Sequence, residues 1–505
     1  MGSIKGSPIS ANGVFGKFDN SYAQLPERFY ARVNPVSVPA PALIKVNRKL
    51  ADLLGLDADM LSSAEGIEVL SGNRVAAGSE PLAMAYAGHQ FGYFVRQLGD
   101  GRANLLGEIV GRDGVRYDIQ LKGSGRTPFS RNGDGRATLG PVLREYLVSE
   151  AMAALGVPTT RALAAVTTGQ MVARETMLPG AVLTRVAGSH LRVGTFQFFF
   201  AQGDGEAVRA LADYAIARHY PEAAKADKRY RALLDGVIER QAALVARWML
   251  LGFVHGVMNT DNTSISGETI DYGPCAFMEA YDPRAVFSSI DHQGRYCYSI
   301  QPHAMHWNLA RLAETLLPLL VEEEGGGEDA GLASAHAALE RFGVCFESEF
   351  YAGMRRKLGL ITEREGDIAL ADDLLRRMAD GRADFTLTFR RLCLAVEGDS
   401  SVVRELFAEP SLFDTWEQAW RKRLSEESIS GRERAEAMCG VNPMFIPRNH
   451  LVEAAIRAAV DRSDFQVFED LLRVVTRPYE EGAGTEYYWK AARPEELVTR
   501  TFCGT

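Results

Sequence analysis

The chain of 505 residues is predicted to adopt an α+β fold, in which a β-rich N-terminal part precedes a mostly helical remainder. Apolar and polar residues alternate in "NLLGEIV" and "RYDIQLK", as is typical of strands that are buried on one face. From about residue 190, apolar residues recur instead at helical spacing. Because one hydrophobic core seldom serves a chain of this length, we expect two or three domains.

The β-rich part is expected to occupy residues 1–187, including an N-terminal extension. Strands are predicted between about residues 82 and 123, with "GRDG" as the turn of a hairpin. The segment "PVLREYLVSEAMAALGV" then has the periodicity of a helix, and Pro141 suits its first turn. Two further strands are expected in "RALAAVTTG" and "MVARETMLPGAVLTRV".

The helical part is expected to form a lobe over residues 188–345 and an extension with a tail over residues 346–505. Helical periodicity is evident in "YRALLDGVIERQAALVARWMLLGF" and in "HAMHWNLARLAETLLPLLVEEE". The stretch "EEEGGGEDAG", residues 322–331, combines charge with glycine, which predicts an exposed loop.

The composition argues against several classes of protein. With 56 Lys and Arg against 65 Asp and Glu, the formal net charge is −9, which gives no general attraction to nucleic acid or anionic membranes. No apolar stretch approaches the length of a membrane span, and the N-terminal segment lacks a targeting pattern. Six cysteines without Cys-x-x-Cys pairs argue against a disulfide scaffold or a zinc site. We therefore expect a cytoplasmic protein that binds neither nucleic acid nor membrane.

The stretch "HGVMNTDN", residues 255–262, resembles the catalytic loop of protein kinases in all but one respect. In the kinase pattern His-x-Asp-x-x-x-x-Asn, the Asp accepts the proton of the substrate hydroxyl and the Asn binds a metal ion. Here Asn262 stands at the metal-binding position, but Val257 replaces the Asp. Asp271 follows in "DYG", which resembles the kinase motif Asp-Phe-Gly, whose Asp also binds the metal.

Two further motifs precede this loop in the order found in kinases. Lys122 ends a predicted strand and Glu145 lies in the next helix, like the kinase lysine that contacts phosphates and its glutamate partner. Upstream, the turn from Gly99 to Arg102 would let the backbone approach phosphate. Taken singly, these are an ordinary turn and surface charges. Their common order, across a change from strands to helices, favours a kinase-like nucleotide site.

Several long blocks closely resemble the SelO (selenoprotein O, YdiU) family, among them "YAGHQFGYFVRQLGDGRANLLGE", "DIQLKGSGRTPFSRNGDGRATLGPVLREYLVSEAM", "FVHGVMNTDNTSISGETIDYGP" and "GVNPMFIPRNHLVE". The resemblance runs from about residue 15 to the end of the chain. It implies a protein-kinase-like two-lobed fold, with a β-rich N-lobe, a helical C-lobe and a helical C-terminal extension. This fold would bind ATP in a reversed orientation with Mg²⁺ or Mn²⁺. The enzyme would then transfer AMP to Ser, Thr or Tyr hydroxyls of proteins, including its own. Transfer of UMP from UTP is also ascribed to bacterial members.

The resemblance also implies roles for individual residues. The nucleotide contacts would be made by a set of glycines and charged residues: Gly99, Gly101, Arg102, Lys122, Asp134, Gly135, Arg185, Arg192 and Asp271. Asn262 and Asp271 would bind the metal, and Glu145 would support Lys122. Several local cations make physical sense, because a triphosphate in an acidic protein needs compensation beyond a divalent ion. Taken singly, Arg185 and Arg192 would be interpreted as surface ion pairs.

Asp261 matches the catalytic base of the family. If the nucleotide is reversed, its α-phosphate faces the acceptor hydroxyl and pyrophosphate leaves, so a base at Val257 would be misplaced. A carboxylate beside a divalent ion stays ionised and can accept a proton. The alternative is that Asp261 orders the loop through an Asx-turn.

Cys503, two residues before the C-terminus, is a candidate redox site. The resemblance implies, for some relatives, regulation by a disulfide between a C-terminal Cys and a Cys of the activation loop. Here Phe287 occupies the matching loop position, and Cys275 and Cys297 flank the loop. A disulfide to one of these two, an intermolecular disulfide and a glutathione adduct are the alternatives for Cys503.

The function that the motifs together with this resemblance imply is that of an enzyme, a protein adenylyltransferase that also transfers UMP from UTP in some bacterial members. One alternative is a phosphotransferase, against which Val257 argues. The other is a catalytically inactive, kinase-like module that senses nucleotide by binding it. Retention of Lys122, Glu145, Asn262 and Asp271 argues against such a module, because a scaffold need not keep both metal ligands.

Overall fold

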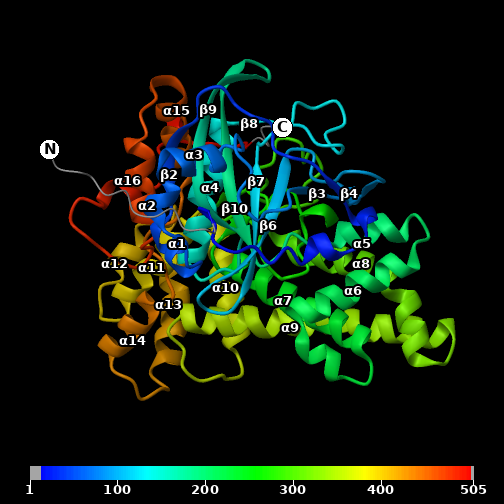
Figure 1. The fold of residues 1–505 in the computed structure, drawn as a ribbon. Helices are drawn as coiled ribbons and strands as arrows, with labels where there is room; N and C mark the ends of the chain where they lie inside the picture. The colour runs from blue at the N-terminus through cyan, green and yellow to red at the C-terminus, as the bar shows by residue number, and fades with distance from the viewer. Residues whose placement is uncertain (1–12, 502–505) are drawn as a thin grey trace.

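The computed structural model describes residues 13–501, and its largest element is an antiparallel sheet of eight strands (Figure 1). The strand order is β1-β3-β6-β7-β10-β9-β2, and β8 pairs with β10. The strands are β1 (Tyr30–Arg32), β2 (Ala42–Val46), β3 (Leu82–Met84), β6 (Ala103–Val110), β7 (Arg116–Lys122), β8 (Ala137–Thr138), β9 (Arg161–Ala173) and β10 (Met177–Ala187). Strands are concentrated before residue 187 and helices after it, which confirms the predicted mixture of a strand-rich part and a helical part.

Strands β6 and β7 form the hairpin that the alternating sequence predicts. The Val115 amide donates a hydrogen bond of 3.0 Å to Asp113 Oδ1, and Gly114 takes a φ of +77°, a conformation that favours glycine. The register pairs Ala103 with Lys122. Lys122 therefore lies at the end of β7, beside the first residue of β6.

Helix α4 (Leu139–Ala154) packs between the sheet and two C-terminal helices, α15 (Asn449–Arg462) and α16 (Gln466–Val475) (Figure 1). Small side chains of β9 and β10, such as Ala165 and Ala181, let the helix approach the sheet closely. The end of the chain thus packs against its β-rich beginning.

Side chains that alternate with those under α4 point to a second core on the opposite face of the sheet. Leu163, Val166 and Val182 belong to this second core, which is covered by α1 (Arg48–Leu53), α2 (Ala58–Leu61) and α3 (Ala64–Leu70). Both faces of the central strands are therefore buried, which holds their ends in fixed positions.

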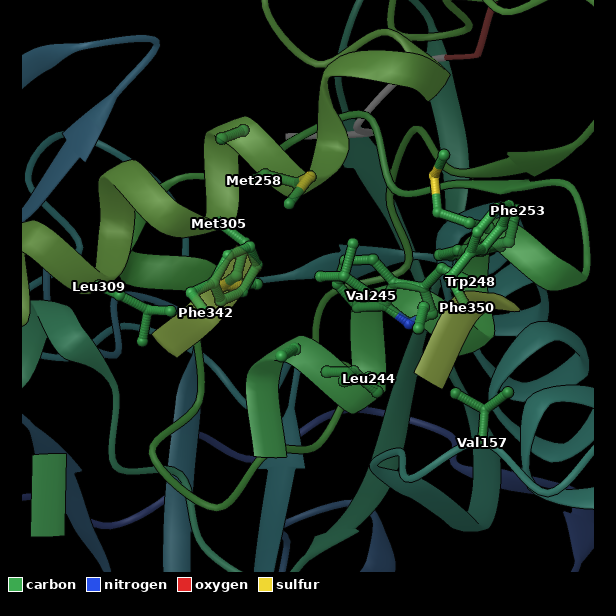
Figure 2. Close-up of a cluster of buried hydrophobic side chains, with 14 of the residues drawn as sticks. Val157, Leu244, Val245, Trp248, Phe253, Met258, Met305, Leu309, Phe342 and Phe350 are labelled. Carbon is green, nitrogen blue, oxygen red and sulfur yellow. The ribbon is translucent and has the colours of Figure 1, made fainter. Parts of the chain in front are cut away.

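The middle of the chain is built from five helices around a largely aromatic and aliphatic core: α5 (Val193–Phe200), α6 (Gly205–His219), α7 (Arg229–Leu250), α8 (Gln301–Glu324) and α9 (Glu328–Lys357). Figure 2 shows part of this core, where Trp248 of α7 lies near Phe253, and Met305 of α8 lies near Phe342 of α9. Met258, from the loop 255–262, is buried in the same cluster. The core therefore anchors the loop that resembles the kinase catalytic loop.

The segment 322–331 is mostly exposed, as predicted, but the prediction that it is a loop is largely wrong. Helix α8 continues to Glu324 and α9 begins at Glu328, so only residues 325–327 connect them. Gly325 ends α8 in the left-handed conformation, with a φ of +67°. Glu328 and Asp329 lie in the first turn of α9, where the helix dipole favours negative charge. The charged residues and glycines of this segment therefore form the C-terminal end of α8 and the N-terminal end of α9.

The remaining helices and strands are short elements: α10 (Asp367–Asp380), α11 (Phe385–Ala395), α12 (Ser401–Arg404), α13 (Pro410–Leu424), α14 (Gly431–Cys439), α17 (Glu486–Trp489), and the strand pairs β4 (Gly88–Gln90) with β5 (Tyr93–Val95) and β11 (Phe253–Val254) with β12 (Ala276–Phe277). Arg448, which precedes α15, joins several of these regions. Its side chain is fully buried and pairs with Glu279 and, at 2.9 Å, with Asp384, the residue that caps α11. This arginine ties the C-terminal helices to the helical core.

We predict that Arg448→Met lowers thermal stability strongly. Removing one partner of a buried ion pair leaves uncompensated charge on Glu279 and Asp384, which costs about 3–5 kcal/mol. The matched control is Arg432→Met, because Arg432 pairs with Glu436 on the surface, where such pairs contribute about 0–1 kcal/mol. Thermal melting of the two variants checks the prediction, and equal melting temperatures would contradict it.

Candidate active site

A cavity of about 510 Å³ opens between the ends of β6, β7 and β10, helix α4 and the loop segment 257–273. Every nucleotide, metal and base residue expected from the sequence, together with Glu145, lines it: Gly99, Gly101, Arg102, Lys122, Asp134, Gly135, Glu145, Arg185, Arg192, Asp261, Asn262 and Asp271. Residues that are up to about 170 positions apart in the chain thus meet in one place.

Lys122 and Glu145, which the sequence pairs, form an ion pair at one wall of the cavity. Arg185 joins them from the neighbouring strand, where it lies opposite Gln120 in the register, and its Nε donates to Glu145 Oε1 at 2.7 Å. Burial tends to raise the pKa of Glu145, but Arg185 and Lys122 outweigh this effect and lower it. Glu145 therefore remains ionised and holds both cations in place.

Asp271 is the centre of the charged network. Its carboxylate accepts from Arg185 Nη2 at 2.8 Å and Arg192 Nη1 at 3.1 Å, and Lys122 Nζ lies 3.4 Å away. Burial alone would raise the pKa of Asp271, but Arg185, Lys122 and Arg192 hold it well below its usual range. Asp271 also has a φ of +66°, an uncommon conformation for a residue with a side chain. The surrounding cations stabilise the carboxylate in this strained position.

The glycine-rich turn at residues 99–102 is packed closely against the segment 127–130. A Cβ on Gly99 would lie 2.3 Å from the Phe129 ring, and one on Gly101 would lie 2.9 Å from the Phe129 carbonyl oxygen. Thr127 Oγ1 donates to the Asp100 carbonyl at 2.7 Å. Glycine at these positions lets the turn form one edge of the cavity without a side chain.

Asp134 and Gly135 lie at another edge of the cavity, where Asp134 already has a partner. Its carboxylate accepts from Arg174 at 2.8 Å and from the Arg136 amide at 2.9 Å. The hydrogen bond from Arg174 is the main reason that the pKa of Asp134 is lowered. Gly135 has a φ of +70°, and a Cβ there would lie 2.1 Å from the Gly125 carbonyl oxygen. These contacts fix the backbone around Asp134.

Asp261 also lines the cavity, but its carboxylate, unlike that of Asp271, forms no ion pair among the described residues. Its Oδ2 accepts a hydrogen bond of 3.1 Å from Gln90 Nε2, while its buried Oδ1 has no hydrogen-bond partner among the described residues. Burial raises the pKa of Asp261 to about 6. Val257, at the kinase base position, also lines the cavity and offers no group that can accept a proton.

Asn262 is oriented by its own loop. Its Nδ2 donates to the Val257 carbonyl oxygen at 3.0 Å, which leaves the amide oxygen available as a ligand. Residues 13–501 contain no group of three or more His, Cys, Asp or Glu side chains that could hold a metal ion. A divalent ion at Asn262 and Asp271 would therefore need oxygen ligands from a nucleotide or water as well.

Sequence reasoning missed several residues of the cavity. Tyr86 lies beneath Arg192, whose guanidinium carbon is 4.5 Å from the ring centre, and the buried Asp100 lies 3.9 Å from Arg192 Nη2. Gln90 contacts Asp261 as described above, and Asn259 lines the wall beside it. Tyr86 and Gln90 stand in the block "YAGHQFGYF", which has no spacing that indicates chemistry. Only the fold brings them to the site.

Cys503 lies outside the described residues. The tail that leads to it is fixed at Thr501, whose amide donates to the Phe287 carbonyl at 2.7 Å and whose side chain donates to the Pro274 carbonyl at 2.5 Å. The tail therefore runs beside the loop that carries Phe287. Cys275 and Cys297, at the flanks of this loop, are both buried.

Within the part of the chain that the structure describes, we find no helix that is long and apolar enough to cross a membrane.

Comparison with known proteins shows the family to which the chain belongs. The family model described as protein adenylyltransferase SelO matches residues 14–476. A protein nucleotidyltransferase YdiU of Methylorubrum populi is 63% identical over 496 residues, which cover 97% of this chain and 99% of the relative. Proteins of the same name from Rhodopseudomonas palustris and Bradyrhizobium diazoefficiens are 62% and 60% identical, each over 490 residues with the same coverage. The chain therefore belongs to the SelO family, as the blocks in its sequence predict.

Proposed function

We propose that this protein is a protein adenylyltransferase, which transfers AMP from ATP to Ser, Thr or Tyr hydroxyls of proteins and releases pyrophosphate. The observation that carries the proposal is one cavity with three cations around Asp271 at one wall, and with Asp261, rather than residue 257, as the available proton acceptor. The family and the names of the relatives support the same activity. Other copies of this chain are among the proposed acceptors, and transfer of UMP from UTP is a second proposed reaction.

The charges of the cavity fit a triphosphate. Arg102, Lys122, Arg185 and Arg192 supply four positive charges to the cavity. The side chains of the last three, which contact carboxylates, are long enough to exchange these contacts for contacts with phosphate. Glu145 and Asp271 neutralise part of this charge in the absence of nucleotide. A bound triphosphate therefore needs additional positive charge. In the proposed site, a divalent ion bound together with the nucleotide would supply it, as in kinases.

We propose that Asn262 and Asp271 hold Mg²⁺ or Mn²⁺ together with the nucleotide. Both residues offer oxygen, the ligand atom that these ions prefer, and the orientation of the Asn262 amide leaves its oxygen available. The ion would neutralise charge on the phosphates when it is bound. Lys122, Arg185 and Arg192 would then turn from Asp271 toward phosphate oxygens.

The proton acceptor determines which phosphate reacts. Val257 cannot accept a proton, so the acceptor hydroxyl must lie near Asp261. In the proposed step, the hydroxyl oxygen forms a bond with the α-phosphorus while its proton passes to Asp261. The bond from the α-phosphorus to the bridging oxygen breaks, and pyrophosphate carries away the electron pair. A reversed nucleotide, compared with kinases, brings the α-phosphate to this position.

Labelled ATP separates this proposal from its alternatives. The purified protein is incubated with Mg²⁺ and with ATP that is labelled in either the α- or the γ-phosphate. Label from the α-phosphate on the protein supports transfer of AMP, whereas label from the γ-phosphate alone would show a phosphotransferase. Nucleotide binding without either label, also with added acceptor proteins, would favour the nucleotide-sensing module.

We predict that Asp271→Ala and Asp261→Ala have different effects. Asp271→Ala should remove the metal-dependent part of ATP affinity together with activity, because the site loses a metal ligand. Asp261→Ala should keep most of this affinity and lower kcat by about 10²- to 10⁴-fold, the range for loss of a general base. Calorimetric titration with ATP and Mg²⁺, with parallel assays of AMP transfer, checks both. Equal loss of affinity in the two variants would make Asp261 a binding residue instead.

We also predict that Val257→Asp does not create a protein kinase. The new carboxylate would stand at the kinase base position, but the γ-phosphate of a reversed nucleotide would lie away from it. The assay measures γ-phosphate label on an added protein, with ATP affinity as the control for an intact site. Strong phosphoryl transfer by this variant would refute the reversed orientation.

A further inference from the structure

The small hairpin of β4 and β5 lies directly against the loop that carries Asp261. One hydrogen bond comes from each of three successive hairpin residues: His89 N to Thr260 Oγ1 at 2.7 Å, Gln90 Nε2 to Asp261 Oδ2 at 3.1 Å, and Phe91 N to Asn259 Oδ1 at 3.1 Å. The hairpin thus contacts three of the four residues from 259 to 262. In the sequence the two segments are separated by about 170 positions.

The turn of this hairpin, at Phe91 and Gly92, has a strained backbone that is stabilised by contacts with the rest of the protein. Phe91 and Gly92 both have positive φ, +51° and +90°, as a tight two-residue turn requires. This conformation is costly for Phe91, which is not glycine. Its ring packs against Tyr296 at 5.1 Å, and the Tyr296 hydroxyl donates to the same Asn259 oxygen that the Phe91 amide contacts. The loop and the turn therefore stabilise each other.

A second series of hydrogen-bond contacts, through Thr260 and Gln197, connects the hairpin to helix α5. Thr260 Oγ1 donates to Gln197 Oε1 at 2.6 Å, and Gln197 Nε2 lies 2.9 Å from His89 Nδ1. Gly88 lets the hairpin backbone come close to Asp261, because a Cβ there would lie 2.5 Å from Asp261 Oδ1. The position of Gln90 is thus determined from both sides.

The two carboxylate oxygens of Asp261 differ in their surroundings. Oδ2 accepts the hydrogen bond from Gln90, whereas Oδ1 is buried and has no hydrogen-bond partner within residues 13–501. A buried oxygen without a partner is costly unless a bound molecule supplies a donor. Oδ1 also packs against Gly88, so the hydrogen bond from Gln90 to Oδ2 and the backbone of the hairpin together set the orientation of the carboxylate of Asp261, a residue that lines the cavity.

We infer that Gln90 is a positioning residue for Asp261, whose carboxylate it holds through Oδ2 in the orientation in which that carboxylate accepts the proton of the acceptor hydroxyl. This inference rests on the proposed function. Gln90 itself neither gives nor takes a proton in the reaction. Its amide keeps the carboxylate plane in one orientation, and this orientation matters because small misplacements of a reacting group are costly in rate.

The test compares Gln90→Ala with a matched glutamine truncation. Gln202→Ala serves as the control, because Gln202 lies at the end of α5 and donates only to the Phe198 carbonyl. Gln90→Ala should lower kcat for AMP transfer to the protein itself and to casein by up to about a hundredfold, with little change in ATP affinity. Gln202→Ala should keep the wild-type kcat.

Two further variants separate the hydrogen bond from packing. Gln90→Glu keeps the size of the side chain but replaces the donor with a like charge, so its loss of kcat should equal or exceed that of Gln90→Ala. Gly88→Ala keeps Gln90 but pushes on Asp261 through the new Cβ, and it should also lower kcat. Wild-type kcat in Gln90→Glu would overturn the inference.

A double-mutant cycle with Asp261→Ala tests whether Gln90 acts through Asp261. In the Asp261→Ala background, Gln90→Ala should cause no further loss of rate. An equal fold-loss in both backgrounds would overturn the inference and show a separate structural role. Wild-type kcat in Gln90→Ala, with Asp261→Ala impaired, would overturn this inference alone. Full activity of Asp261→Ala, or absence of AMP transfer by the wild-type protein, would overturn the proposed base or reaction as well.

Discussion

The site depends above all on the partly buried carboxylate of Asp271 and the three cations that surround it. Lys122 lies at the end of β7, Arg185 lies in β10, and Arg192 is the residue that precedes α5. A single buried charge in this place would cost several kcal/mol, so each of the four charges needs the others. Their contacts fix the sheet, the helical part and the loop after residue 262 relative to one another.

The second carboxylate of the cavity, that of Asp261, has different surroundings. The carboxylate of Asp261 accepts a hydrogen bond from the Gln90 amide and packs against Gly88 of the β4–β5 hairpin. Burial, rather than a nearby cation, is the main cause of the shift of its pKa. The cavity therefore combines a cluster of cations around Asp271 with a second carboxylate, that of Asp261, which no cation pairs among the described residues. In the proposed reaction, this division explains why Val257 can stand where kinases need an Asp.

Much of this arrangement could be predicted from local sequence signals. Alternation predicted β6 and β7, and the strand-end position of Lys122 indicated its partner Glu145. The loop prediction at residues 322–331 failed because charged residues and glycine serve equally well as helix caps. The packing of α15 and α16 against α4, and the contact of Gln90 with Asp261, join distant segments. No local pattern reports such contacts, since they arise only when the chain is folded.

The orientation of the nucleotide is the central claim, and it can be measured directly. A crystal structure of the protein with a non-hydrolysable ATP analogue and Mg²⁺ would show which phosphorus atom lies nearest the Asp261 carboxylate. The account predicts that this is the α-phosphorus, with the β- and γ-phosphates among Lys122, Arg185 and Arg192. A γ-phosphorus nearest Asp261, with the α-phosphate deep among the cations, would contradict it.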